Sequence, residues 1–80
     1  MQRNSGVGKF VVDDVRIRSA PSVGSGVVGK HKAGDTVNYD SVMNVEGRTW
    51  ISYIESSGNR RYCCAIDKDG DVYIINTQPQ

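Results

Sequence analysis

Apolar and polar residues alternate in several short segments of this chain. The alternation is visible in residues 15–18, 36–42, 49–54 and 61–66, and residues 72–75 are apolar throughout. Successive side chains of a β-strand point to opposite faces, so this two-residue period is typical of strands that bury one face. No segment of ten or more residues shows the 3.6-residue period of a helix. The pattern therefore predicts an all-β fold of about five to seven short antiparallel strands.

Segments that contain glycine separate the predicted strands. They are Ala33–Asp35, Glu46–Gly47, Ser56–Asn59 and Asp67–Asp71, and their residue types are those that tight turns favour. Short strands joined by tight turns are typical of a small barrel or sandwich. We expect the folded domain to occupy residues 10–76, with a flexible lead-in over residues 1–9 and a tail over residues 77–80.

Length and charge restrict the function classes. A chain of 80 residues forms one domain and removes only about 60 % of its surface from water, which leaves little material around a deep catalytic pocket. The net charge of +1 provides no strong field to attract nucleic acid or anionic lipid. No run approaches the roughly 18 apolar residues of a membrane-spanning helix, and no signal segment follows Met1. We therefore expect neither a nucleic-acid nor a membrane partner.

Two motifs suggest a bound ligand but lack the full pattern. Residues 24–31, GSGVVGKH, have the glycine and lysine spacing of a phosphate-binding loop. That loop also needs a strand before it, a helix after it and a hydroxyl residue after the lysine, where this chain has His31. Residues 67–71, DKDGD, resemble the start of a calcium loop, but the glycine falls at the fourth position instead of the sixth and no glutamate lies at the twelfth. We expect a glycine-rich loop and a hairpin turn at these places, and no cofactor.

The inventory for catalysis or metal binding is also small. Cys63 and Cys64 are the only cysteines and His31 is the only histidine, so a zinc site is disfavoured. Adjacent strand residues point to opposite faces, so the two cysteines are not expected to bond to each other. His31 lies between two lysines in a segment that we expect to be exposed. We predict that this chain is not an enzyme.

Aromatic residues are numerous for so small a barrel. The chain has one Trp, four Tyr and one Phe, whereas a barrel of this size houses about three or four large rings. Some rings are therefore expected to line a surface groove suited to a peptide, edged by Arg18, Arg60 or Arg61. The alternative, in which all the rings belong to the core and its edges, stays open at this point.

A longer set of motifs resembles a known family. Residues 31–66 contain K-A-G-x-T from Lys32, Y-D-x-V-M from Tyr39, G-x-x-W from Gly47 and S-G-x-R-x-Y from Ser57. In this order and spacing they closely resemble the bacterial SH3-like (SH3b) cell-wall-targeting domains of lysostaphin-type endopeptidases and phage endolysins. The segment RIRSAPS, from Arg16, resembles the entry segment of the same family. The resemblance implies a small SH3-like β-barrel.

The resemblance also implies a function and a site. Such domains bind the peptide or cross-bridge part of Gram-positive peptidoglycan and anchor a separate catalytic domain, an amidase or endopeptidase. The matching positions imply ligand-binding roles for Arg18, Tyr39, Ser41, Met43, Tyr62 and Tyr73. Ser41 stands where lysostaphin-like domains carry an acidic residue, and Tyr73 takes the place of their C-terminal Trp. Both departures make another cross-bridge or stem peptide as suitable a ligand as pentaglycine.

Several questions stay open from the sequence. The alternative function is an SH3-like adaptor that binds proline-rich peptides through an acidic aromatic groove and has no role at the cell wall. A protein of the proposed kind is made in the host bacterial cytoplasm and acts at the cell wall after release. The sequence leaves undecided whether Met1 is an internal translation start, and whether copies of the chain form homo-oligomers.

Overall fold

The computed structural model describes residues 5–77, and every regular element in that range is a β-strand. Eight strands are present, one more than the upper end of the range expected from the sequence. They are β1 (Gly6–Phe10), β2 (Val15–Arg18), β3 (Val27–His31), β4 (Thr36–Tyr39), β5 (Ser41–Val45), β6 (Arg48–Ile54), β7 (Arg60–Ile66) and β8 (Ile74–Asn76). The all-β expectation is confirmed. Over residues 5–77 there is no helix with the length and apolar character to cross a membrane.

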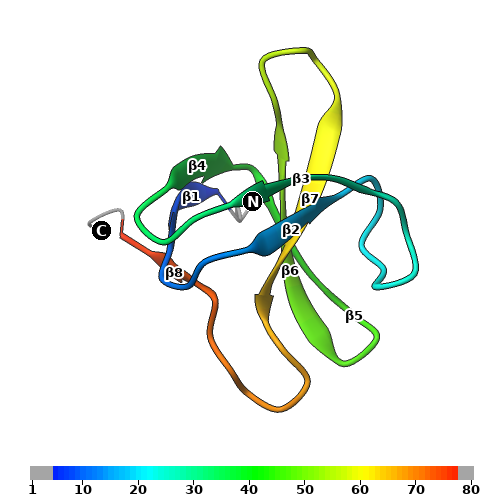
Figure 1. Ribbon diagram of the computed structural model, residues 1–80, viewed down its shortest axis with the longest axis vertical. Coiled ribbons are helices and arrows are strands. Elements are labelled where there is room, and N and C mark those ends of the chain that lie inside the picture. Colours follow the sequence, from blue (N-terminus) through cyan, green and yellow to red (C-terminus); the bar gives the residue numbers. More distant parts are fainter. Residues whose placement is uncertain (1–4, 78–80) are drawn as a thin grey trace.

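The strands form two antiparallel sheets that pack around one core (Figure 1). The smaller sheet has the order β4-β1-β8 and the larger sheet has the order β3-β2-β7-β6-β5. Inward-facing residues of both sheets meet between them, and burial of their apolar surface is the main source of stability in such a fold. The core consists of Phe10, Val15, Tyr39, Ile51, Tyr53, Cys63, Ala65 and Ile74.

The first strand corrects the expected domain boundary. Residues 6–9 were expected to belong to a flexible lead-in, but they form most of β1, which is the central strand of the smaller sheet. Gly6 and Gly8 are buried there because the ring of Tyr39 and the side chain of Ile74 lie where their own side chains would be. Alternation of glycine with other residues gives no apolar period, so the strand left no signal in the sequence. Residues 1–4 and 78–80, at the ends of the expected lead-in and tail, lie outside the described residues.

The turns have the predicted positions. Glu46 and Gly47 both have positive φ, 58° and 73°, which is the geometry of a type I′ turn and matches the twist of the two strands it joins. Gly34, Gly58 and Gly70 also have positive φ in the other predicted turns.

The glycine and lysine motif has a different structure from a phosphate-binding loop. Its residues 27–31 form β3, and a turn follows directly at residues 33–34. The hairpin expected at residues 67–71 is present, since the Asp67 N–H donates to the Asp71 carbonyl at 2.9 Å. Neither segment therefore has the geometry of the ligand loop that its sequence resembles.

Candidate functional site

Three of the predicted site residues lie on one row across the larger sheet. Arg18 of β2 pairs with Tyr62 of β7, Tyr62 pairs with Ser52 of β6, and Ser52 pairs with Ser41 of β5. Directly opposed residues in antiparallel strands place their side chains on the same face. Ile51 and Cys63, which neighbour Ser52 and Tyr62 along the chain, belong to the core. The row therefore lies on the outer face of the sheet, and we call Arg18, Tyr62, Ser52 and Ser41 the outer row.

A second row continues this face toward the β5–β6 turn. Met43 pairs with Trp50, and Trp50 pairs with Cys64. Trp50 is fully buried although it is not part of the core between the sheets. Its indole N–H donates to the Val45 carbonyl at 3.1 Å. Met43 and Cys64 are half-buried on either side of the tryptophan, so the second row is an apolar floor beside the polar outer row.

Arg18 and Tyr62 retain hydrogen-bonding capacity on the outer row. The Arg18 guanidinium donates one bond, from Nη1 to the Ser25 carbonyl at 2.9 Å, which fixes it against the loop between β2 and β3. Across residues 5–77, no other side-chain hydrogen bond involves Arg18, and none involves the Tyr62 hydroxyl. A guanidinium carries five N–H donors and a phenol carries one. Both groups are half-buried and are available to donate to the carbonyl groups of a bound peptide.

An ion pair closes one end of the outer row. Arg60 contacts both carboxylate oxygens of Asp40, at 2.7 and 3.0 Å, and its Nη1 also donates to the hydroxyl of buried Ser52 at 2.9 Å. The Arg60 guanidinium lowers the pKa of Asp40 through these hydrogen bonds. Arg60 therefore covers Ser52 and lies beside the candidate surface. Arg61 is on the other face, where it pairs with Glu55 at 3.1 Å, so of the two arginines only Arg60 edges the site.

Tyr39 and Tyr73 differ from the other predicted site residues. Tyr39 was expected to bind ligand, but it is only 8 % exposed and belongs to the core. Its ring lies over Gly6 and Gly8 of β1. Tyr39 therefore packs in the core and is not a member of the candidate site. Tyr73 is half-buried, and its hydroxyl donates to Asp67 Oδ2 at 2.9 Å. It lines a pocket next to the second row, which Arg18 also lines.

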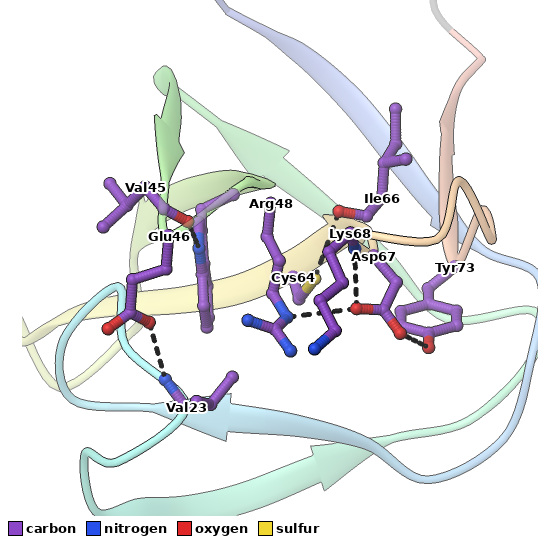
Figure 2. Close-up of polar contacts among 10 residues, drawn as sticks. Val23, Val45, Glu46, Arg48, Cys64, Ile66, Asp67, Lys68 and Tyr73 are labelled. Atoms are coloured by element: carbon purple, nitrogen blue, oxygen red, sulfur yellow. Dashed lines mark hydrogen bonds and ion pairs between the residues drawn. The ribbon is translucent and has the colours of Figure 1, made fainter.

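This pocket has a charged lining that the sequence did not reveal. It has a volume of about 380 Å³, and we call it the charged pocket; six of its lining residues are Arg18, Arg48, Trp50, Cys64, Asp67 and Tyr73. Figure 2 shows Asp67 between Arg48 and Tyr73, bonded to both. Arg48 and Asp67 are 19 residues apart, and no local motif links them. Their ion pair is a product of the fold and could be found only from the structure.

The histidine and one cysteine each contact the hydroxyl of Tyr53, but they do not form a catalytic pair. His31 was expected to be exposed, yet its side chain is only 19 % exposed and stacks on Phe10 with 4.3 Å between ring centroids. Its Nε2 lies 3.0 Å from the Tyr53 hydroxyl, which lies 3.9 Å from the Cys63 sulfur. Burial raises the pKa of the Cys63 thiol to about 12. A nucleophilic cysteine needs a lowered pKa and an accessible sulfur, so this arrangement is suited to packing.

Cysteine and metal chemistry give no further site. Both cysteines are free thiols, with Cys63 in the core and Cys64 on the outer face, as the alternation of the strand predicted. Within the part of the chain that the structure describes, no group of three or more His, Cys, Asp or Glu side chains is arranged to hold a metal ion.

Comparison with known proteins decides the family. The family model described as bacterial SH3 domain matches residues 3–65 of this chain. The chain belongs to the bacterial SH3 domain family. The match begins before β1, which agrees with the inclusion of that strand in the fold. The resemblance stated from the motifs at residues 31–66 is thereby confirmed.

The relatives of this bacterial SH3 domain include an autolysin and lysostaphin. It is 33 % identical over 69 residues to the probable autolysin PH of Staphylococcus aureus, an alignment that covers 80 % of this chain and 14 % of the autolysin. It is 47 % identical over 45 residues to lysostaphin of Staphylococcus simulans, which covers 56 % of this chain and 8 % of lysostaphin. The chain thus spans a small part of each relative's length.

Solved structures show the same fold. The lysostaphin SH3b domain in its P4-G5 complex has a TM-score of 0.78 and 26 % identity, over 92 % of this chain and 86 % of that one. The cell wall binding domain of the staphylococcal phage 2638A endolysin has a TM-score of 0.80 at 20 % identity, over 92 % and 88 % of the two chains. The second likeness concerns the fold alone. The SH3-like barrel expected from the motifs is therefore confirmed.

Proposed function

We propose that this bacterial SH3 domain is a non-catalytic cell-wall-binding domain of a phage endolysin or related peptidoglycan hydrolase. Its ligand is the peptide or cross-bridge part of Gram-positive peptidoglycan. The observation that carries the proposal is the outer row, where Arg18 and Tyr62 pair directly and leave donors available on the exposed face of the sheet. The lysostaphin SH3b domain, with the same fold, forms a complex described as P4-G5.

The chemistry of the outer face suits an extended peptide with small side chains. The Arg18 guanidinium and the Tyr62 hydroxyl donate to peptide carbonyls, and the thioether of Met43 and the tyrosine ring pack on the peptide backbone. The Arg60–Asp40 pair beside the row narrows the surface. A narrow surface gains specificity by excluding larger residues. Ser41 supplies a neutral hydroxyl where lysostaphin-like domains carry an acid, so the preferred bridge need not be pentaglycine.

The wider role follows from the kind of protein in which such domains occur. The matched relatives are far longer than this chain, and we infer that a covalently linked or associated amidase or endopeptidase domain cleaves the wall. The binding domain concentrates that enzyme on its substrate, and the repeated sites of the wall strengthen a modest single-site affinity. We further infer synthesis in the bacterial cytoplasm and action at the cell wall after release.

Co-sedimentation with purified sacculi tests the proposal. The full chain is mixed with sacculi from Gram-positive species that differ in cross-bridge, and Tyr62→Ala is compared with Val42→Ala. Val42 is exposed on the same sheet but pairs with core residue Ile51, so its side chain lies on the opposite face from Ser41 and Met43.

We expect the wild type and Val42→Ala to bind a subset of the sacculi, and Tyr62→Ala to bind at least about tenfold more weakly, which is the loss of roughly 1.4 kcal/mol. Both variants are first checked for native folding by circular dichroism. Absence of binding to every type of sacculus would reject the cell-wall role. The adaptor function would then be tested with proline-rich peptides.

A further inference from the structure

The charged pocket holds an arginine whose terminal nitrogens are not used by the fold. Arg48 begins β6 directly after the Glu46–Gly47 turn, and its side chain is 18 % exposed. Its Nε donates to Asp67 Oδ1 at 3.0 Å, and in residues 5–77 this is its one side-chain hydrogen bond. The contact uses one edge of the guanidinium. The two terminal nitrogens remain as donors in the fixed fork geometry that matches a carboxylate.

Asp67 holds this guanidinium in place, and both oxygens of its carboxylate accept hydrogen bonds. Besides the bond from Arg48, it accepts hydrogen bonds from the Lys68 backbone N–H at 2.7 Å and from the Tyr73 hydroxyl at 2.9 Å. These contacts, the Lys68 N–H first among them, lower the pKa of Asp67. The carboxylate therefore stays charged and keeps Arg48 oriented, and its contact with the arginine is through Nε and not through a terminal nitrogen.

The surroundings add positive charge and one flat wall. Arg16 and Arg18 line the pocket from β2. Half-buried Tyr73 provides an aromatic wall. A volume of about 380 Å³ lies within the roughly 300–1,000 Å³ of pockets that bind small ligands. The pocket is thus large enough for the last residues of a peptide.

Acidic residues in the pocket lining restrict the charge of the ligand. Asp13 and Asp14 also line the pocket, and Asp13 Oδ1 accepts a hydrogen bond from the Ala33 N–H at 3.0 Å. With Asp67 they oppose a dianion such as phosphate through like-charge repulsion. A single carboxylate on a small apolar residue fits better, because it pairs with Arg48 while the residue packs on the ring of Tyr73.

The geometry points to a subsite for the free α-carboxylate of a peptide, with the terminal nitrogens of Arg48 as its clamp. This assignment rests on the proposed function, because the peptide that the pocket binds is taken to be a peptide of the cell wall. The outer row suits a peptide that continues past the domain. The charged pocket suits a peptide that ends there, and it thereby favours uncrosslinked peptide ends.

Titration of the ¹⁵N-labelled full chain by NMR tests this subsite without sacculi. The probes are acetyl-Ala-Ala, in its L and D forms, the corresponding C-terminal amides, and inorganic phosphate. We expect at least one of the free-acid peptides to shift the resonances of the Arg48 Nε–H, the Trp50 indole N–H and the backbone N–H groups of Cys64 and Tyr73. The C-terminally amidated peptides should shift the same resonances far less. Loss of one charge-assisted pair predicts roughly tenfold or weaker binding for the amide.

Two variants and a matched control identify the clamp. Arg48→Gln should weaken binding of the acid about tenfold, and Arg48→Lys, which preserves the charge opposite Asp67, should also weaken it because the planar fork is lost. Lys32→Gln removes a positive charge from an exposed residue outside the pocket lining and should leave binding unchanged. A native spectrum of Arg48→Lys separates loss of the clamp from loss of the fold.

Each outcome has a distinct meaning. The carboxylate subsite would be overturned by equal shifts with the acid and the amide peptides, or by no shifts with either. It would also be overturned by tighter binding of phosphate than of the acids, or by shifts only along the outer row. If wild-type chain binds sacculi but the dipeptide acids leave the pocket unchanged, the subsite fails and the cell-wall function stands. If the dipeptide acids bind at Arg48 but no sacculus is bound, the cell-wall function fails and the subsite stands.

Discussion

Replacement of Gly8 by alanine should destabilise the fold, although residues 6–9 looked like a flexible lead-in from the sequence. An added Cβ at Gly8 would lie 2.9 Å from Ile74 Cγ2, 3.4 Å from Tyr39 Cδ2 and 3.5 Å from Ile51 Cδ1. All three neighbours belong to the core, so none can move aside into solvent. Overpacking of this kind costs about 1–3 kcal/mol. Alanine also reduces the entropy of the unfolded chain, which returns about 0.4–1 kcal/mol.

Gly26→Ala is the matched control for this effect. A Cβ at Gly26 meets only Ser19 Oγ at 3.7 Å, an ordinary contact, and the residue has no positive φ. Both variants change the unfolded chain in the same way, so the entropy term cancels between them. Gly8→Ala should therefore be about 1–3 kcal/mol less stable than Gly26→Ala, and its melting temperature lower by roughly 4–20 °C.

Urea unfolding followed by the fluorescence of Trp50 measures this difference by linear extrapolation. The tryptophan is fully buried, so its emission should change strongly when the chain unfolds. Equal stability of the two alanine variants, within about 0.5 kcal/mol, would refute the reasoning. It would mean that β1 is not packed between Tyr39 and Ile74 in solution.

Two further predictions concern ionisation. Hydrogen bonds from the Lys32 and Lys68 backbone N–H groups, respectively, are the main cause that lowers the pKa of Asp35 and of Asp67 below the ordinary value of 3.8. The two carboxylates therefore stabilise the fold fully above that value, and this stabilisation is lost as the pH falls through their lower folded-state pKa. The midpoint of urea unfolding should be constant from pH 7 to 5 and should drop below pH 4. A midpoint that stays constant down to pH 2.5 would contradict this. Burial raises the pKa of both cysteine thiols. An aromatic disulfide reagent at pH 8 should therefore modify the native chain much more slowly than the urea-unfolded chain, and half-buried Cys64 should react before Cys63. Equally fast reaction of both cysteines in the native chain would contradict their burial.

The turns and strand faces were predictable from the sequence because their causes are local. Glycine at Gly34, Gly47, Gly58 and Gly70 permits the positive φ that each turn uses. The alternation of residues 61–66 correctly placed Cys63 and Cys64 on opposite faces. Local backbone preference and side-chain period act within a few residues, so a single sequence is sufficient to find them.

Features that depend on distant residues escaped the sequence. The burial of Gly6 and Gly8 is caused by Tyr39, more than 30 residues later. His31 looked exposed between two lysines, but the fold brings it against Phe10 and Tyr53. The burial of these residues depends on which strand packs against them, and the two-residue period of a strand does not show which other strand that is.

The division between the two faces of the larger sheet explains how one fold can serve different wall peptides. Inward residues such as Ile51 and Cys63 are fixed by packing in the core, whereas Ser41, Met43 and Tyr62 point outward from the same strands. Replacement of an outward residue leaves the core packing intact, so the side chain at Ser41 can change without a change of fold. Arg48 combines both requirements, because its Nε anchors it to Asp67 while its terminal nitrogens are left for a ligand. Specificity can therefore change at the outer row by single substitutions, but a change of the charged pocket must preserve the Arg48–Asp67 pair or replace it as a unit.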